Sequence, residues 1–303
     1  MGRVALIDGD IIAYSCGFAS DAAAAKDGMA YEPWGFCRHG VDATIQAIKE
    51  AAGAEEHVVV LTAHGGGYRD EVFPAYKAGR TAAKPHYYAA IREHLINVWG
   101  GFESAHGREA DDELGILAAE YGERGVICTK DKDLDCVPGL HYNFSKTRKA
   151  TGVYMVSTVE ADRFFYKQML TGDFTDNIPG MFRILGMKAT AKWLSPIDDM
   201  TDPKEMYSYV REVYGTLFKE QQAMGKLPDH DYNLTDPKAL EAFLLFLGTL
   251  LWIQREDGSV FRPPHGIFSG VAEAHDKEEE AVVYGWIAVE EAIAEVAKTY
   301  DSR

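Results

Sequence analysis

The sequence predicts an α/β protein built on a parallel sheet and followed by a helical region. Three short apolar runs, at residues 4–7, 58–61 and 126–128, are bounded by polar or glycine residues. Helix-length stretches separate these runs, which is the pattern of parallel strands joined by helical crossovers. From about residue 172 the pattern changes to helical segments punctuated by Gly, Pro and Asp, ending in the apolar stretch 242–252. We expect a second, helical domain there.

Length and composition indicate an ordinary folded protein. The chain has 303 residues, and a domain of ~150 residues is typical, so two domains are expected. Contents of 47% hydrophobic and 26% charged residues exclude a collagenous, low-complexity or wholly disordered chain. No run reaches the ~18 apolar residues of a membrane span, and no signal-peptide pattern follows Met1, so a cytoplasmic location is expected. The cysteines have no C-x-x-C spacing and are expected to be reduced: Cys16, Cys37, Cys128 and Cys136.

The net charge excludes two classes of binding protein. With 31 basic and 47 acidic residues, the formal net charge is −16. This balance argues against a general nucleic-acid coat and against a protein that binds anionic membranes. Any contact with DNA must therefore be local. The net charge alone is compatible with two arrangements of the acidic residues: a solvated acidic surface, or carboxylates gathered to hold cations.

Acidic residues follow two of the three expected strands. Asp8 ends the first run, and Asp131 and Asp133 come shortly after the third. Because ligands bind at the carboxyl ends of parallel strands, these carboxylates are expected to converge. The alternation of side chains along an extended chain predicts that Asp131 and Asp133 point to one side.

Two further acidic clusters occur at expected helix starts or turns. Glu109, Asp111 and Asp112 open a helix, where acids are favourable on electrostatic grounds alone. The apolar residues that follow would pull this turn against the sheet, where buried acids need cations. Asp173 and Asp176 would face the same way if their turn were helical, and a simple Asx turn is the alternative.

The acids together suggest a site for hard divalent cations. Oxygen ligands without His or Cys favour Mg²⁺ or Mn²⁺ over zinc. Two such ions ~4 Å apart can hold the attacking and leaving oxygens of a phosphodiester. The candidate ligands are Asp8, Glu109, Asp111, Asp112, Asp131, Asp133, Asp173 and Asp176.

A basic segment supplies candidate phosphate-binding groups. Lys77, Arg80 and Lys84 would share one face of a helix. Such a face could stabilise a phosphate, and the ring of Tyr76 could stack on a base. A solvated helix face is the alternative reading.

Taken jointly, the motifs resemble a known family. The segments are Tyr76-Lys77-x-x-Arg80, Lys84-Pro85, Glu109-Ala110-Asp111-Asp112, Asp131-Lys132-Asp133 and Leu247-x-x-x-Leu251-Trp252-Ile253. Their order and spacing resemble the metal-dependent 5′-nucleases, or flap endonucleases, which include the 5′-to-3′ exonuclease domains of bacterial DNA polymerases. The resemblance covers about residues 4–255 and is strongest to the gene-six type exonucleases of short-tailed phages.

The resemblance implies an architecture and a role for each matched residue. Residues 1–170 would form a PIN-like α/β nuclease domain with a helical arch, 171–255 a helix–three-turn–helix region that binds DNA, and 256–303 a C-terminal extension. A first metal centre would use Asp8, Glu109, Asp111 and Asp112, and a second Asp131, Asp133, Asp173 and Asp176. Lys77 and Arg80 would act with Asp8 in catalysis. Substrate would contact Tyr76, Lys84, Arg69, Gly186, Lys188 and Lys192.

The chain departs from the family pattern in two places. Thr62 stands where the family usually has an aspartate, seven residues before Arg69. His64 could substitute for it, the Thr62 hydroxyl could hold a water, or the first centre could be weaker. The glycine-rich hairpin around 180–186 lacks its middle glycine, which puts monovalent-ion binding there in doubt. A helix expected after Gly186 could still receive a phosphate at its N-terminus.

These features predict a Mg²⁺-dependent 5′-to-3′ DNA exonuclease of phage origin, with flap-cutting and RNA-removing capacity and no membrane partner. One alternative is a haloacid-dehalogenase-type phosphatase, since Asp8-x-Asp10 imitates its nucleophile motif. Another is a non-catalytic DNA-structure binder, for which Thr62 is the main support. The apolar residues spaced along 282–300 predict an amphipathic helix. It would dock on its own domain or bind a replication protein.

Overall fold

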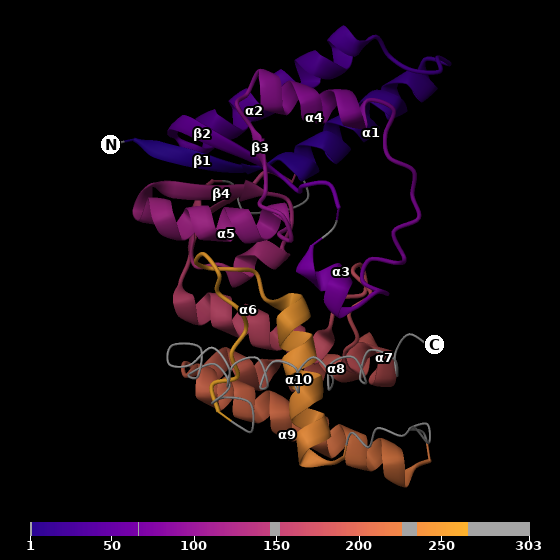
Figure 1. Ribbon diagram of the computed structural model, residues 1–303, viewed down its shortest axis with the longest axis vertical. Coiled ribbons are helices and arrows are strands. Elements are labelled where there is room, and N and C mark those ends of the chain that lie inside the picture. Colours follow the sequence, from indigo (N-terminus) through magenta and orange to yellow (C-terminus); the bar gives the residue numbers. More distant parts are fainter. Residues whose placement is uncertain (1, 66, 146–151, 226–234, 266–303) are drawn as a thin grey trace. The chain divides into compact units, whose positions relative to one another are not determined.

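The computed structural model describes the chain except residues 1, 66, 146–151, 226–234 and 266–303 (Figure 1). It divides into two compact units. The first comprises Met1–Gly67, Thr81–Ala161 and Ile253–Ser259, and the second Tyr68–Arg80, Asp162–Trp252 and Val260–Arg303. The amphipathic helix expected over 282–300 lies outside the described residues.

A six-stranded, mostly parallel sheet organises the first unit, which confirms the expected α/β fold. Its strands are β1 (Arg3–Asp8), β2 (Ala54–Leu61), β3 (Phe102–Glu103), β4 (Gly125–Thr129), β5 (Gly139–Asn143) and β6 (Tyr154–Val156). The order is β3-β2-β1-β4-β5-β6, and only the β5–β6 pair is antiparallel. The three apolar runs are β2, β1 and β4, the central strands. Because the chain moves to opposite sides of β1, the carboxyl ends of β1 and β4 flank a topological switch point, where α/β proteins bind ligands.

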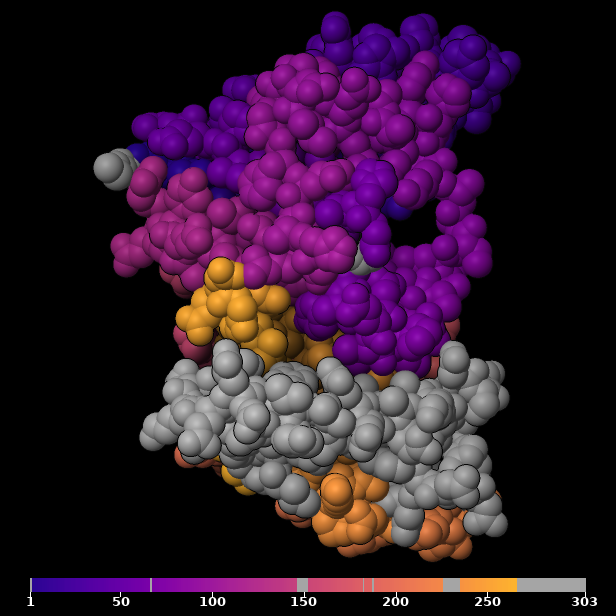
Figure 2. All heavy atoms as spheres, viewed as in Figure 1, coloured from indigo at the N-terminus to yellow at the C-terminus, as the bar shows by residue number. Residues whose placement is uncertain are grey.

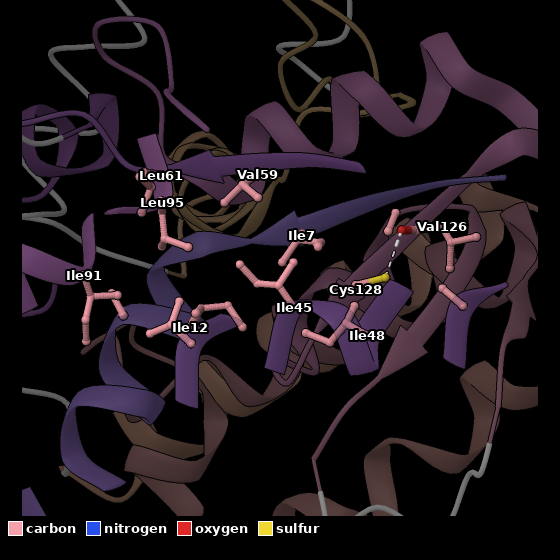
Figure 3. Close-up of a cluster of buried hydrophobic side chains, with 14 of the residues drawn as sticks. Ile7, Ile12, Ile45, Ile48, Val59, Leu61, Ile91, Leu95, Val126 and Cys128 are labelled. Atoms are coloured by element: carbon pink, nitrogen blue, oxygen red, sulfur yellow. Dashed lines mark hydrogen bonds between the residues drawn. The ribbon is translucent and has the colours of Figure 1, made fainter. Parts of the chain in front are cut away.

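Helices cover both faces of this sheet, as a parallel sheet requires. On one face, α1 (Gly9–Lys26), α2 (Trp34–Ala52) and α4 (Tyr88–Asn97) bury an aliphatic core against the sheet (Figure 3). Ile7, Ile12, Ile45 and Ile91 of that core are fully buried. On the opposite face, α5 (Ala110–Tyr121) packs against β1, β2 and β4. The outer side chains of α4 and α5 are visible in the space-filling view (Figure 2).

The chain after β4 differs from the expected alternation. The strand ends at Thr129, and a 3-10 helix, η2 (Asp133–Cys136), begins four residues later. A second 3-10 helix, η1 (Gly122–Arg124), precedes β4. Asp131 and Asp133 are therefore not part of an extended strand, which was the premise for expecting both side chains on one side. The side chain of Asp131 accepts a hydrogen bond from the N–H of Asp133 (2.9 Å), which favours a turn.

The second unit is helical, as the sequence predicts. Its elements are α3 (Tyr68–Val72), α6 (Thr158–Thr171), which begins in the first unit, α7 (Met181–Leu185), α8 (Met187–Thr190), η3 (Ala191–Trp193), η4 (Ser195–Asp199), α9 (Pro203–Ala223) and α10 (Pro237–Leu251). The apolar run is α10, and the carboxylate of Asp236, the residue before it, caps the helix. The rings of Phe243, Tyr214 and Phe218 pack together in its core, with centroids 5.1 to 5.6 Å apart.

The basic segment is not helical, which corrects the expected arch. From Phe73 to Tyr87, all of it described, the chain forms turns and irregular backbone without a helix. Pro74 and Pro85 lack the N–H that a helix interior needs, and Lys77 has a φ of +56°, outside the right-handed helical region. Lys77, Arg80 and Lys84 therefore do not share a helical face.

The helix expected after Gly186 is short and changes from α to 3-10 after one turn. Gly186 has a φ of +78°, Lys188 belongs to the four-residue α8, and Lys192 belongs to η3. A helix does follow Gly186, because α8 continues directly into η3, and phosphate binding at its start stays a prediction.

Two further expectations can be compared with the described residues. The four cysteines are free thiols, as predicted. No helix in the described part of the chain is both long enough and apolar enough to cross a bilayer.

Candidate active site

Asp8 occupies the carboxyl end of β1 and also caps α1. Its Oδ1 accepts a hydrogen bond from the N–H of Ile11 (3.0 Å), and its Oδ2 accepts one from the Thr129 hydroxyl (2.8 Å). The residue is 3% exposed. Asp8 thus joins the ends of β1 and β4, at the switch point of the sheet.

Asp131 and Asp133 continue this cluster from β4. The N–H of Asp131 donates to the hydroxyl oxygen of Thr129 (3.0 Å), so Thr129 contacts both Asp8 and Asp131. The carboxylate of Asp133 forms an ion pair with Lys132 at 2.8 Å. The structure therefore brings Asp8 and Asp131 to one edge of the sheet, as the sequence predicts.

The acids at the start of α5 form a capping box. The side chains of Glu109 and Asp112 each accept a hydrogen bond from the other residue's backbone N–H. Asp112 is fully buried, and its Oδ1 also accepts from the N–H of Gln254 (3.2 Å). Helix capping therefore accounts for part of the role of these acids. Asp111 lies in the first turn of the same helix.

Thr62 connects the start of α5 to the first turn of α1. Its hydroxyl accepts a hydrogen bond from the N–H of Ala110 (2.9 Å), and its own N–H donates to Oδ2 of Asp10 (2.9 Å). Arg92 of α4 donates to Oδ1 of Asp10 (2.8 Å), to the carbonyl oxygen of Thr62 (2.7 Å) and to Glu103 (2.7 Å). The carboxyl end of β2 is therefore held in place by a buried arginine that lies between two carboxylates.

The environment of Asp8 disfavours its charged form. The pKa of Asp8 is raised from 3.8 to about 7, chiefly by burial. The nearby charges of Asp10 and Asp131 add to this rise, and the hydrogen bonds from Ile11 and Thr129 oppose it. Near neutral pH, this edge of the sheet therefore carries negative charge that its own hydrogen bonds do not fully stabilise.

The donor set fits a hard divalent cation. The first-unit candidates are all carboxylates, and a cation beside Asp8 would offset its burial and the repulsion from its neighbours. Within the described residues, however, no group of three or more His, Cys, Asp or Glu side chains is already arranged to hold a metal ion. Cation binding would thus require these side chains to move.

Asp173 and Asp176 lie in the second unit, in a turn. Oδ1 of Asp173 accepts hydrogen bonds from the N–H groups of Thr175 (2.6 Å) and Asp176 (3.2 Å). This is the Asx-turn alternative and not a helical turn. Asn177 follows with a φ of +62°, and its amide donates to the carbonyl oxygen of Ala75 (2.6 Å).

Asp176 ties this turn to the basic segment. Its carboxylate forms ion pairs with Arg80 and with Lys77 (3.9 Å), and it accepts a hydrogen bond from the Tyr76 hydroxyl (3.2 Å). The N–H of Lys77 also donates to the backbone carbonyl oxygen of Asp176 (3.0 Å). The candidate phosphate-binding cations are therefore gathered beside a candidate metal ligand.

Two predicted substrate contacts are structural residues instead. Tyr76 is 6% exposed and its ring centroid lies 4.7 Å from the ammonium of Lys77, so little of the residue is accessible to a base. Arg69 is 3% exposed and donates to the carbonyl oxygens of Leu250 (2.9 Å) and Trp252 (2.5 Å). These carbonyls end α10, where a helix lacks internal partners, and they attract the guanidinium inward.

Sequence reasoning missed the partners of the acids. Thr129, Arg92 and Glu103 have no motif of their own, and only the fold brings them to the ends of β1 and β2. Asp10 had a signal, since it stands two residues after Asp8. Lys84 is exposed, with its ammonium 4.5 Å from the ring of Tyr88.

The fold and the acidic edge define a class of protein, the α/β proteins with a carboxylate-lined site at the carboxyl ends of a parallel sheet. Comparison with known families specifies it. The model of the family "5'-3' exonuclease, N-terminal resolvase-like domain" matches residues 3–162. The chain belongs to this family of 5′-3′ exonucleases, which are phosphodiester hydrolases. That membership disagrees with the haloacid-dehalogenase alternative.

Curated relatives are much longer proteins. The chain is 27% identical over 239 residues to DNA polymerase I of Chloroflexus aurantiacus, covering 71% of this chain and 24% of that protein. It is 30% identical over 235 residues to the thermostable DNA polymerase I of Thermus thermophilus, covering 73% of this chain and 27% of that protein. The chain thus spans about a quarter of the length of these relatives.

A solved structure supports the fold. T5 5'-exonuclease with bound divalent zinc ions superposes with a TM-score of 0.51 at 17% identity, over 96% of this chain and 99% of that chain. At this identity the likeness concerns the fold alone.

Proposed function

We propose that this chain is a Mg²⁺-dependent 5′-to-3′ exonuclease. It hydrolyses phosphodiester bonds of duplex DNA from 5′ ends and nicks, cuts 5′ flaps and removes RNA from RNA–DNA hybrids. The observation that carries the proposal is the buried Asp8 carboxylate at the switch point, bonded to Thr129 and close to two further acids. Membership of the exonuclease family supports the reaction, and the DNA polymerase I relatives support DNA as the substrate.

The proposed metal ligands are eight carboxylates. A first centre would use Asp8, Glu109, Asp111 and Asp112. The candidates for a second are Asp131 and Asp133 of the first unit and Asp173 and Asp176 of the second. When bound, Mg²⁺ makes hydroxide available near neutral pH and neutralises charge on the phosphate. Mn²⁺, with the same preference for oxygen ligands, replaces it.

The residues of the chain itself provide orientation and charge. Thr129 and the N–H of Ile11 hold the Asp8 carboxylate in one orientation. Lys77 and Arg80 bind the nonbridging oxygens of the scissile phosphate, where charge develops in the transition state. Lys84, Lys188 and Lys192 contact the DNA backbone, which is the usual role of surface lysines in DNA binding.

The domain roles follow from the same resemblance. The segment 171–255 acts as the helix–three-turn–helix region that grips the duplex, and residues 1–170 carry the chemistry. In this proposal the protein resembles the gene-six type phage exonucleases and works in a bacterial cytoplasm.

One gel experiment tests the reaction. Duplex, nicked and flapped DNA, labelled at either the 5′ or the 3′ end, is incubated with Mg²⁺ or with EDTA. Release of 5′-terminal nucleotides with Mg²⁺ and not with EDTA is expected. A dominant product of junction size would indicate a structure-specific endonuclease instead.

Thr62 favours a second candidate, a DNA-structure binder without catalysis. Thr62 stands where the family usually has an aspartate, so one carboxylate of the family pattern is absent. Among the described residues, no three His, Cys, Asp or Glu side chains are already arranged to hold a metal ion. Binding of flapped DNA with no cleavage across titrations of Mg²⁺ and Mn²⁺ would select this reading.

A further inference from the structure

We infer that Asp10, fixed by Arg92, supplies the carboxylate that Thr62 does not. Asp10 is therefore an additional residue of the cation-binding edge, and Arg92 is its positioning residue. The inference rests on the proposed function, because it concerns the same metal-dependent site.

The position of Asp10 is the first argument. Its Oδ2 accepts a hydrogen bond from the backbone N–H of Thr62 at 2.9 Å. The carboxylate thus lies against the residue at which the family acid is missing, at the end of β2. Asp10 also lies in the first turn of α1, two residues after Asp8 and directly after Gly9. An acid from α1 therefore reaches the end of β2.

Arg92 provides the second argument. Its side chain is 7% exposed, and it donates to Asp10, to the Thr62 carbonyl oxygen and to Glu103. The hydrogen bond from Arg92 lowers the pKa of Glu103, which keeps that acid charged. A buried guanidinium with three oxygen partners has little freedom to move. It fixes Asp10 and the end of β2 relative to each other.

The other groups near Thr62 have different tasks. The imidazole of His64 is 81% exposed, and its Nδ1 lies 3.2 Å from Glu103. The Thr62 hydroxyl accepts the N–H of Ala110 and so helps to begin α5. Asp10 is the carboxylate that touches the Thr62 backbone.

Asp10 can serve a cation while it stays bonded to Arg92. Each carboxylate oxygen can accept two hydrogen bonds, and the described residues supply one donor each to Oδ1 and Oδ2, which leaves each oxygen a further acceptor position. The side chain is 22% exposed, which leaves room for water. Mg²⁺ usually keeps several waters, and Asp10 would accept hydrogen bonds from them. Partners of this kind typically contribute ~10–100-fold to metal affinity.

The test measures Mn²⁺ binding by calorimetry in the full chain, without DNA, and Mg²⁺-dependent cleavage in parallel. Asp10→Asn is expected to weaken Mn²⁺ binding by ~10–100-fold. Adding Thr62→Asp to that variant should recover most of the loss, because it returns a carboxylate to the same edge. The new side chain can still accept the N–H of Ala110, so the start of α5 is preserved.

Two further variants separate this role from folding. Asp21→Asn is the matched control, because Asp21 lies on the same helix and also accepts a backbone N–H, that of His86 (3.1 Å). It should bind Mn²⁺ like the wild type. Asp10→Glu keeps the charge next to Arg92 but displaces the carboxylate, and it should retain the unfolding temperature while weakening Mn²⁺ binding. It carries the test if Asp10→Asn does not fold.

Each outcome of this test either supports or overturns the inference. Wild-type Mn²⁺ affinity in folded Asp10→Asn or Asp10→Glu overturns the inference, and so does a double variant as weak as Asp10→Asn alone. A wild-type chain that binds no Mn²⁺ also overturns it. If the wild type binds Mn²⁺, Asp10→Asn does not and the double variant recovers, the inference stands even where no DNA is cleaved, and only the proposed exonuclease activity fails.

Discussion

The hydroxyl of Thr129 donates a hydrogen bond to the carboxylate of Asp8 at 2.8 Å and accepts the N–H of Asp131 at 3.0 Å. One short side chain thus connects acids from the ends of two neighbouring strands. Asp8 is nevertheless buried beside other negative charges, so its charged form is costly in the absence of a cation. The cost of burying this charge leads to the first prediction.

Asp8→Asn should stabilise the metal-free protein at pH 8. The folded-state pKa of Asp8 is about 7 and the ordinary value is 3.8, so the folded state holds a proton that the unfolded state releases. The free energy of unfolding of the wild type therefore falls, by the contribution of Asp8, as pH rises from about 4 to about 7. The asparagine carries no charge and escapes this loss.

The measurement is the unfolding temperature in EDTA at pH 5 and pH 8. We expect the variant to exceed the wild type at pH 8 by at least ~2–4 °C, the shift that ~1 kcal/mol produces in a domain of this size. The advantage should shrink at pH 5, and Mg²⁺ should raise the wild type more than the variant. An advantage that is larger at pH 5 than at pH 8 would contradict the assigned environment of Asp8.

Asp131→Asn should reduce turnover while DNA binding persists. Loss of one electrostatic stabiliser costs ~10²–10³-fold in turnover. The amide can still accept the N–H of Asp133, so the local turn should remain. Single-turnover cleavage and binding to flapped DNA are measured together.

Asp135→Asn is the control for this experiment. Asp135 lies two residues beyond Asp133 and accepts a hydrogen bond from the Tyr154 hydroxyl (2.7 Å), outside the candidate site. It should cleave like the wild type. Equal turnover in Asp131→Asn and the wild type would remove Asp131 from the proposed second centre.

Much of the fold was predictable because burial leaves a local pattern. The runs that became β1, β2 and β4 are apolar since helices cover both faces of the sheet, and the run that became α10 is apolar since it is almost wholly buried. The acids at strand ends were predictable because they follow these apolar runs closely in the sequence. The segment around Lys77 was predicted as a helix because residue spacing does not reveal the effect of Pro74 and of a positive φ.

The partners of the acids could not be predicted from the sequence. Arg92 reads as one polar position of an amphipathic helix, and its bonds to Asp10 and Thr62 join residues 82 and 30 positions apart. Arg69 stands beside the basic segment in sequence, yet it is drawn inward by the carbonyl oxygens of Leu250 and Trp252. Such contacts depend on the tertiary fold.

Arg80→Ala should weaken catalysis and change the salt dependence of DNA binding. Arg80 forms an ion pair with Asp176 while half of its side chain is exposed, so it can reach a phosphate. Removing one phosphate contact should lower the slope of log affinity against log salt by about 1. Turnover should fall ~100-fold, the usual effect of losing one transition-state donor.

Lys167→Ala is the matched control, because Lys167 forms a comparable surface ion pair with Asp198 in the same unit. Neither variant should change stability by more than ~1 kcal/mol, since exposed pairs contribute little. If both variants change the salt slope equally, Arg80 has no special role at the phosphate.

Gly115→Ala should destabilise the first unit although alanine is the better helix former. Gly115 lies in α5, and a Cβ there would overlap the carbonyl oxygen of Gln254. Overpacking of this kind costs ~1–3 kcal/mol. Gly40→Ala in α2 is the control, because a Cβ at Gly40 meets no atom within 4 Å and the substitution should stabilise by ~0.5–1 kcal/mol. Urea unfolding of both variants gives the comparison, and a stabilised Gly115→Ala would show that Gln254 does not pack against Gly115 of α5.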